Sequence, residues 1–416
     1  MSTEILSGIR VLALTQVWAG PLAARLLADL GADTIKVEYH ERPDIVRMMF
    51  TPAGDKSQRV FDHGGYFHTM NRNQRGIALN LNSPEGKEAF LRLVKVSDVL
   101  IENYSPRVMH NWGLGYDSLR AVNPRLIMVS LSGFGSSGPY RDTVAYGNSI
   151  DPMSGLTYLT GYQDGPPIRS ALSYPDPVAS VHAAFAILAA LYERETSGQG
   201  QFIDVSMLEA ATAFVGEAIG DYTRTGTLPE RIGNRAQFHA PSGVFHCQGE
   251  DAWVAVAATN DREWQALCQI IGRKDLADDP TLATTAGRKQ REDEIDAAIA
   301  AWTAQQSKQE AMRALQQAGV PAGAVLTNEE ELEDEQLRAR GFFLRIPYPD
   351  GLGEFEHVGF PFKLSETPLQ LRYRAPCLGE HNHQVLTELC GYTAEEVRQL
   401  EEKGIVGSAP SFPFQA

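Results

Sequence analysis

Asp176 stands between two prolines, directly before a long run of apolar and small residues. Pro175 and Pro177 favour an extended chain up to this point, and proline is favoured at the first position of a helix. The pattern therefore predicts Asp176 as the N-cap of a helix over residues 178–191, with its carboxylate at the positive end of the helix dipole. A carboxylate held ionised at a helix end, over a buried platform, is also able to act as a nucleophile. Residue chemistry alone leaves both roles open.

The helix that carries this carboxylate is apolar or small almost without interruption over residues 178–191, which predicts that it is buried on every side. It is too short to cross a membrane, which takes roughly 20 apolar residues. The N-terminus lacks the charged-then-apolar layout of a signal peptide. Gly198 and Gly200 predict a tight turn after the helix, and residues 202–205 predict a strand. We expect a cytoplasmic protein with no membrane partner.

The N-terminal segment has the pattern of a βαβ unit. Residues 9–14 predict a buried parallel strand, residues 22–30 a helix that Gly31 ends, and residues 34–37 a second strand. The first turn and helix N-terminus of such a unit form a natural place for a phosphate or adenosine group.

A dinucleotide site is one reading of this unit, since Glu38 follows the first turn at the distance of a ribose-binding acid. The turn itself runs Ala19-Gly20-Pro21 and lacks the G-x-G-x-x-G fingerprint. This absence argues against a nicotinamide-dependent oxidoreductase, which binding of NAD would test.

Further elements follow in the same alternating order. Residues 77–81, 99–102 and 126–131 predict strands, and Ser83 with Pro84 begins a helix. A stretch rich in Gly, Pro and Arg over residues 223–246 suits a linker with functional loops. Beyond it we expect a strand over 253–257, a helix from near Asp261, and charged helices over 275–333.

The composition and net charge of the chain argue against several classes of binding partner. The 416 residues are 43% hydrophobic and 21% charged, with a formal net charge of −15. A chain this acidic is unsuited to nucleic acid or an anionic membrane, and a polyanionic ligand would need a local basic pocket. The four cysteines are widely spaced, which indicates reduced thiols and no zinc site. His239 and His246 lack a third ligand at metal spacing, so no metal is expected.

Several blocks of the chain resemble the family III CoA-transferases, the group that contains formyl-CoA and carnitine CoA-transferases. The blocks occur in family order, at residues 6–38 (LSGIRVLALTQVWAGP…), 70–106 (MNRNQRGIALNLNSPEG…), 174–208 (YPDPVASVHAAF…) and 233–272 (GNRAQFHAPSGVF…). The resemblance implies an α/β fold with a Rossmann-like large domain built from both chain ends, a small inserted α+β domain and an interlocked homodimer. The implied bounds are 1–210 for the first part of the large domain, 225–325 for the small domain and 326–416 for the return segment.

The resemblance also implies residue roles. Asp176 matches the family's nucleophile, and the CoA-binding positions fall on the following residues: Val17, Trp18, Ala19, Arg75, Leu79, Asn103 and Tyr104. The implied activity moves CoA from an acyl-CoA thioester to a free carboxylic acid, with the CoA thioester as substrate and no permanently bound cofactor.

The chain departs from formyl-CoA transferase at several points. Tyr39, Asn82 and Asn111 stand where that enzyme uses basic contacts, so the CoA phosphates need other partners. The candidates are four arginines: Arg42, Arg47, Arg72 and Arg75. Gly147 replaces a Glu near the nucleophile, which leaves the acids exchanged unidentified.

Two alternatives on the same fold stay open. Tyr146 stands where related acyl-CoA racemases have a general-base His, and the loss of one member of the acid–base pair argues against racemisation. A non-catalytic CoA-binding partner subunit would bind CoA and form no covalent adduct.

Overall fold

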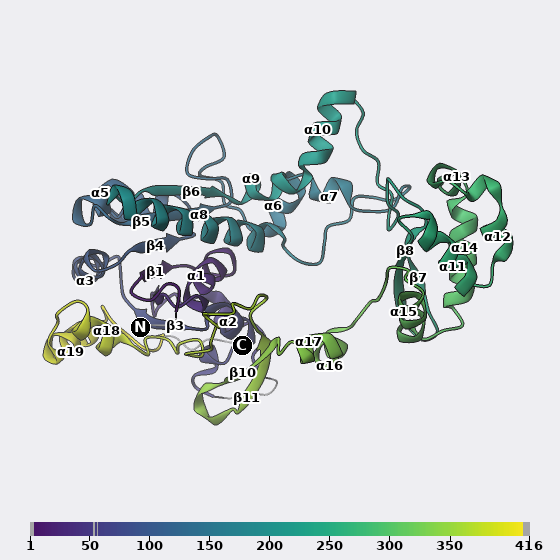
Figure 1. Cartoon of the computed structure of the whole chain (residues 1–416). Coiled ribbons are helices and arrows are strands. Elements are labelled where there is room, and N and C mark those ends of the chain that lie inside the picture. Colours follow the sequence, from purple (N-terminus) through teal and green to yellow (C-terminus); the bar gives the residue numbers. More distant parts are fainter. Residues whose placement is uncertain (1–3, 53–54, 56, 411–416) are drawn as a thin grey trace. The chain divides into compact units, whose positions relative to one another are not determined.

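A six-stranded parallel sheet lies at the centre of the structure, a computed structural model that describes residues 4–52, 55 and 57–410. The strand order is β3-β2-β1-β4-β5-β6 (Figure 1). The strands are β1 (Arg10–Leu14), β2 (Asp33–Glu38), β3 (Gln74–Ala78), β4 (Val99–Glu102), β5 (Ile127–Ser132) and β6 (Phe202–Ser206). This is the order of doubly wound dinucleotide-binding folds, so the predicted α/β class with a parallel sheet is confirmed.

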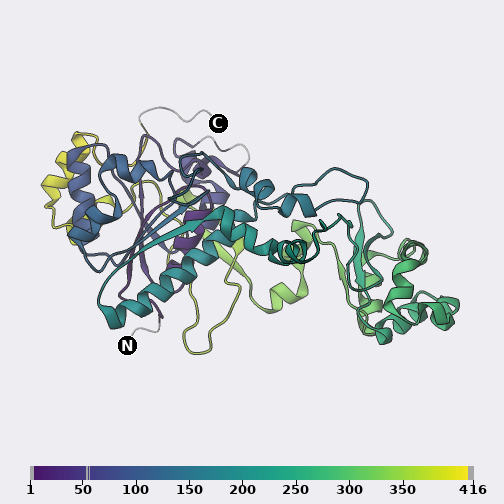
Figure 2. The same ribbon diagram turned by 90° about the horizontal axis from the view of Figure 1, so that it is seen from above.

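Helices cover both faces of this sheet (Figures 1 and 2). One face packs against α1 (Ala19–Asp29) and α8 (Pro175–Ser197) through a cluster of small and branched apolar residues. The opposite face packs against α3 (Pro84–Lys95), α5 (Tyr116–Val122) and the C-terminal helices α18 (Asn382–Glu388) and α19 (Ala394–Glu402). The last helices of the chain thus complete a sheet whose strands all come from the first half.

Strand β4 has the predicted bounds, whereas β3 begins and ends three residues earlier than expected. The residues after β3 leave the parallel ladder because the C-terminal segment pairs with them. Leu79 bridges Val406 in antiparallel fashion, and the N–H of Asn80 donates to the carbonyl of Ile405 at 2.8 Å. A contact across more than 300 residues leaves no local signal in the sequence.

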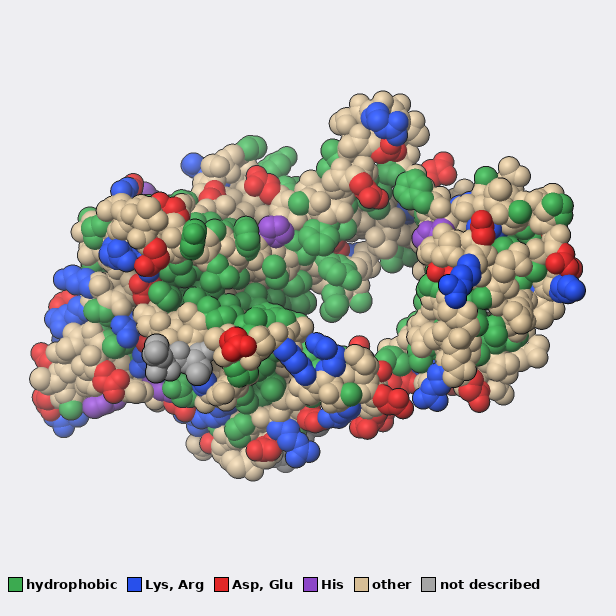
Figure 3. Space-filling model, viewed as in Figure 1, with side chains coloured by type: hydrophobic (Ala, Val, Ile, Leu, Met, Phe, Trp, Pro, Cys, Tyr) green, Lys and Arg blue, Asp and Glu red, His purple; other side chains and the backbone are tan. Residues whose placement is uncertain are grey.

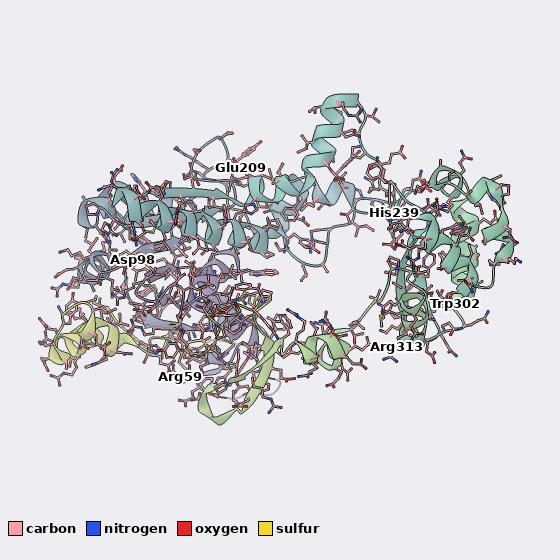
Figure 4. All side chains as sticks on the ribbon, viewed as in Figure 1. Arg59, Asp98, Glu209, His239, Trp302 and Arg313 are labelled. Atoms are coloured by element: carbon pink, nitrogen blue, oxygen red, sulfur yellow. The ribbon has the colours of Figure 1, made fainter. Side chains whose placement is uncertain are left out.

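The prediction for α8 was wrong in its start, its length and its burial. The helix begins at Pro175, so Asp176 lies in its first turn and Tyr174 is the N-cap. Proline fits the first position because the N–H that it lacks has no partner inside the helix there. The helix runs on to Ser197, since Arg194 is buried and pairs with Asp98 at 2.9 Å (Asp98 is labelled in Figure 4).

Only one face of α8 is buried. The side chains of Val181, Phe185 and Tyr192 are 57%, 72% and 84% exposed. By length and hydropathy alone this helix of 23 residues could cross a membrane. Its other face packs on α1 and β5, as a core helix of a sheet protein does.

Two compact units make up the chain. The first consists of Met1–Leu156, Arg169–Thr225 and Ala339–Ala416. Its remaining elements are η1 (Ile45–Met48), η2 (Val60–Asp62), α2 (Gly65–Asn71), α4 (Arg107–Trp112), α6 (Gly147–Met153), α9 (Met207–Thr212), η3 (Ala213–Val215), α10 (Gly216–Thr225), β10 (Phe343–Pro347), η5 (Pro349–Gly351) and β11 (Glu354–Val358).

The second unit consists of Thr157–Ile168 and Gly226–Arg338, around an antiparallel sheet of order β7-β8-β9. Its elements are β7 (Ser242–His246), β8 (Trp253–Ala257), α11 (Asp261–Ile270), α12 (Lys274–Asp278), η4 (Pro280–Leu282), α13 (Thr285–Gln290), α14 (Glu292–Thr303), α15 (Lys308–Gln317), β9 (Ala322–Ala324) and α16 (Asn328–Glu333). Helices α7 (Leu156–Leu159) and α17 (Glu335–Ala339) lie at its boundaries.

Residues 157–168 group with this second unit, although the sequence placed them in the first domain. Contacts with the segment after α10 explain the difference. The N–H of Gly233 donates to the carbonyl of Gly161 at 2.9 Å, and the Arg231 guanidinium reaches the carbonyl of Tyr158 at 3.2 Å.

A buried ion network closes the loop after β2. The Arg47 guanidinium is fully buried and binds the carboxylates of Glu38 at 2.6 Å and Asp62 at 2.9 Å. Burial raises the pKa of Glu38, but the charge and hydrogen bonds of Arg47 outweigh burial and lower that pKa from 4.5 to about 2. Arg47 is therefore a structural residue of this loop, because the nitrogens of its guanidinium already bind the two carboxylates and are not available to a ligand.

Replacing Arg47 by Met should lower the free energy of unfolding by about 3–5 kcal/mol at neutral pH, because Glu38 stays buried without its partner and Asp62 keeps only its pair with Arg59. The stability that the low pKa of Glu38 supplies is fully present above pH 4.5 and is lost as the pH falls toward 2, so the deficit should shrink below pH 4.5. Urea unfolding at several pH values measures both effects. The control is Arg398→Met, which removes an exposed pair with Glu395 and should change stability by less than about 0.5 kcal/mol. A loss equally small for Arg47→Met would contradict the prediction.

Candidate active site

A cleft opens at the carboxyl ends of β1 and β4, where the strand order of the sheet reverses. Ligands of doubly wound folds bind at such switch points. The cleft holds about 870 Å³ of empty space, part of it open to solvent. Its lining residues are Gln16, Val17, Ala19, Asn103, Tyr104, Ser105, Pro106, Leu131, Ser132, Gly133, Phe134, Arg141, Thr143, Val144, Ala145, Tyr146, Asp176 and Met207. Five residues predicted for the site from the sequence are thus brought together: Val17, Ala19, Asn103, Tyr104 and Asp176.

The loop after β1 forms one wall of the cleft and is held in a strained conformation. Val17 has φ of 66°, in the left-handed region that branched side chains rarely adopt. Its N–H donates to Asp44 Oδ1 at 3.0 Å, and Asp44 in turn pairs with the buried Lys36 at 3.0 Å. Lys36 Nζ also donates to the carbonyl of Thr15 at 2.8 Å. Asp44 and Lys36 therefore position this wall from behind.

Asn103 fixes the same loop from β4. Its side-chain oxygen accepts the N–H of Gln16 at 2.8 Å, and its amide nitrogen donates to the Gln16 carbonyl at 2.9 Å. A Cβ on Gly20 would lie 2.7 Å from this amide, so only glycine fits there. The amide of Asn103 thus acts on the backbone of the loop as well as facing the cleft.

Asp176 enters the cleft from the first turn of α8. Ser173 Oγ donates to Asp176 Oδ2 at 2.6 Å, and the N–H of Ala19 also donates to the carboxylate. The buried Ser180 Oγ lies 2.7 Å from the carbonyl oxygens of both Ala19 and Asp176. These contacts hold the start of α8 against the start of α1 and fix the carboxylate between them.

Burial raises the pKa of the Asp176 carboxyl above its ordinary value of 3.8, while the hydrogen bonds from Ser173 and Ala19 act in the opposite direction. A partly desolvated carboxylate is less stabilised by water and so more reactive as a nucleophile. No other carboxylate is among the described residues that line the cleft.

Gly147, the first residue of α6, leaves the space that this carboxylate occupies. A Cβ added there would lie 1.6 Å from Ser173 Oγ and 2.0 Å from Asp176 Oδ2. A side chain at this position therefore has no room in the arrangement seen here.

Three predicted binding residues lie outside the cleft lining. The Trp18 ring packs edge to face on Tyr66, with centroids 6.0 Å apart. Leu79 is buried in the core that faces α3. Arg75 donates to Asp33 from Nη2 at 2.7 and 2.8 Å and from Nε at 3.0 Å, at the opposite, amino-terminal edge of the sheet. The charge of Arg75 is thus already neutralised, which no local pattern revealed.

The other arginines predicted to contact the CoA phosphates differ in whether a carboxylate of the protein already binds them. Arg72 is buried against Asp29 at 2.8 Å, and Arg47 belongs to the buried network described above. Arg42 is exposed just after β2 and has no side-chain partner within the part of the chain that the structure describes. Arg141 is the one basic side chain among the described lining residues, and its only ion pair is with its exposed neighbour Asp142 at 3.3 Å.

The side chains of the described residues give no support for a metal site. Within residues 4–52, 55 and 57–410, no three His, Cys, Asp or Glu residues come together in a way that could hold a metal ion. The four cysteines are unpaired.

Comparison with known proteins identifies the family. The family model described as CoA-transferase family III matches residues 6–382. The chain belongs to CoA-transferase family III.

Relatives in this family align along almost the whole chain. A succinyl-CoA–D-citramalate CoA-transferase of Chloroflexus aurantiacus is 36% identical over 401 residues, 96% of this chain and 98% of that protein. A succinate–glutarate CoA-transferase of Agrobacterium fabrum is 37% identical over 384 residues, 92% of this chain and 95% of that protein. The crystal structure of a CAIB/BAIF family protein from Brucella suis matches with a TM-score of 0.83 at 32% identity, covering 93% of this chain and 100% of that one. These family III relatives support a CoA-transferase activity for this chain.

The prediction from the sequence missed several residues of this family III site. Ser173 stands three residues before Asp176, a spacing typical of capping motifs, which could have revealed their contact. Ser132 Oγ is buried at the cleft wall and has no hydrogen-bond partner among the described atoms. Arg141 stands in a Gly-rich loop that carries no recognisable motif.

Replacing Gly147 by Ala should lower the rate of CoA transfer at least about 10²-fold, because the new methyl group displaces Ser173 or the Asp176 carboxylate by more than 1 Å. Steady-state kinetics with the purified protein measures this loss. A matched control is Gly115→Ala, where an added Cβ meets no atom within 4 Å and φ is −66°. Equal rates for the two variants would show that the carboxylate does not need its observed position.

Proposed function

We propose that this protein transfers CoA from an acyl-CoA thioester to a free carboxylic acid, with Asp176 as the covalent carrier. The observation that carries the proposal is the position of Asp176, a desolvated carboxylate at the wall of the switch-point cleft. Membership of CoA-transferase family III supports the reaction class.

The reaction begins when one Asp176 oxygen attacks the thioester carbonyl carbon. A C–O bond forms, the C–S bond breaks, and CoA leaves as the thiolate, which gives a mixed anhydride. The thiolate then attacks the Asp176 carbonyl carbon, and the donor acid leaves as a carboxylate. The product is an aspartyl-CoA thioester, and an acceptor carboxylate runs the two steps in reverse. No proton or electron enters or leaves in this sequence.

Both intermediates are activated acyl groups, so the cleft has to keep water away from them. Apolar residues supply much of its wall, among them Val17, Leu131, Phe134 and Met207. The N–H of Ala19 lies against the carboxylate and is a donor for negative charge on its oxygens during transfer.

For substrates we propose acids with a second carboxylate, of the succinate type. The names of the relatives from Chloroflexus aurantiacus and Agrobacterium fabrum contain succinyl-CoA, succinate, glutarate and citramalate. Arg141 is a suitable partner for such a carboxylate, since its exposed pair with Asp142 is weak and easily replaced by a bidentate contact.

Replacing Asp176 by Asn should reduce exchange between succinyl-CoA and a dicarboxylic acid by about 10³-fold or more, because the amide cannot form the anhydride. The substitution should not destabilise the fold. The pKa of Asp176 is raised, so its ionised form costs stability above that pKa and the cost vanishes at low pH. The free energy of unfolding of the Asn variant should therefore equal or exceed that of the unmodified protein at neutral pH. Retained exchange would refute the proposed carrier.

We further propose that two copies form an interlocked homodimer. The exposed apolar side chains of α8, Val181, Phe185 and Tyr192, support this assembly, because such a stripe is costly to leave in water. Figure 3 shows hydrophobic side chains gathered over the part of the first unit where Figure 1 places α1 and α8.

Replacing Phe185 by Asp should therefore weaken self-association, since a charge would enter the apolar interface. Sedimentation velocity across a concentration series measures the change. The control is Glu195→Gln on the same helix, which alters an exposed polar residue. A monomer for the unmodified protein, or equal dimer strength for both variants, would overturn the assembly.

A further inference from the structure

Ser173 makes the shortest side-chain contact to the carboxylate in the cleft. Its Oγ lies 2.6 Å from Asp176 Oδ2, which is the length of a hydrogen bond from a hydroxyl to a charged oxygen. The same two residues meet a second time through the backbone, because the N–H of Asp176 donates to the Ser173 carbonyl at 3.2 Å. The hydroxyl is thus held in place by the turn that starts α8.

This contact also distinguishes the two carboxylate oxygens. Ser173 binds Oδ2, and a hydrogen-bond donor makes an oxygen a weaker nucleophile. The other oxygen, Oδ1, is therefore better suited to attack the thioester. Oδ2 then becomes the carbonyl oxygen of the anhydride and keeps Ser173 as its neighbour.

We propose that Ser173 is a further catalytic residue, which donates a hydrogen bond to Asp176 Oδ2 while the CoA thiolate adds to the Asp176 carbonyl carbon. In that step a C–S bond forms, the carbonyl π electrons move onto Oδ2, and the anhydride C–O bond then breaks to release the donor carboxylate. The Ser173 proton stays on Ser173 throughout. The inference rests on the proposed function of Asp176.

The geometry around the pair fits this role. Gly147 leaves room for both groups, since a Cβ there would collide with Ser173 Oγ and Asp176 Oδ2 alike. The N–H of Ala19 is a second donor to the same carboxylate. A hydroxyl and a backbone N–H aimed at one carboxyl group form a preorganised pair of donors for the charge that develops on it.

The two steps of the reaction should respond differently to the loss of this donor. In the first step the carboxylate gives up its negative charge, so the hydrogen bond to Oδ2 weakens and offers no help. In the second step Oδ2 gains a full charge, so the hydrogen bond strengthens. Removal of the hydroxyl should therefore slow the second step far more than the first.

The test is Ser173→Ala, compared with Ser170→Ala and Asp176→Asn. Ser170 belongs to the same loop, and its hydroxyl binds the carbonyl of Leu172 at 2.6 Å, away from Asp176. We expect Ser173→Ala to lower kcat for CoA exchange about 10²-fold, with KM changed much less. Release of free thiol from succinyl-CoA should continue at a rate near that of the unmodified protein, so that hydrolysis rises relative to transfer.

A pH profile separates catalysis from a structural role. The Ser173 hydrogen bond lowers the pKa of Asp176, so its removal should move the acidic limb of kcat/KM to higher pH. Ser170→Ala should leave this limb in place. An unchanged profile and an unchanged ratio of hydrolysis to transfer in Ser173→Ala would overturn the inference. Full activity of Asp176→Asn would instead refute the underlying carrier, so the two failures are distinguishable.

Discussion

A buried hydroxyl links the start of α8 to the start of α1, where the two helices also pack through apolar side chains. Ser180 Oγ lies within 2.7 Å of the carbonyl oxygens of Ala19 and Asp176, one on each helix. Beside this contact, the Ala19 N–H donates to the Asp176 carboxylate at the wall of the cleft. The site therefore exists because two helices on one face of the sheet begin at the same place.

The sheet and the buried pair of Lys36 and Asp44 position the wall of the cleft that the loop after β1 forms. Switch-point topology places the loops after β1 and β4 side by side, and Asn103 ties them together through the backbone of Gln16. Lys36 and Asp44 then hold Val17 in a conformation that it would not adopt alone. A rigid wall of this kind suits a reaction whose intermediates have to be kept from water and from rotation.

Much of this could be predicted from the sequence, because the signals are local. Alternating apolar runs gave the parallel sheet, and the proline-flanked Asp176 marked the start of a helix. The role of Gly147 beside Asp176 could not be predicted, since this residue contributes by the absence of a side chain. The ion-pair partners of the arginines could not be predicted either, because Arg75 binds Asp33, which lies forty-two positions away in the sequence. The exposed face of α8 escaped notice because its outward residues are as apolar as its inward ones.

The central claim is that Asp176 carries CoA in a thioester bond, and chemical trapping tests it most directly. The protein would be mixed with succinyl-CoA and treated with borohydride, which reduces a thioester to an alcohol and leaves a free carboxylate unchanged. Peptide mass spectrometry would then locate the reduced residue. The account predicts that the residue at position 176 is converted to homoserine, and only when succinyl-CoA is present. An unmodified Asp176, or reduction at a different carboxylate, would contradict it.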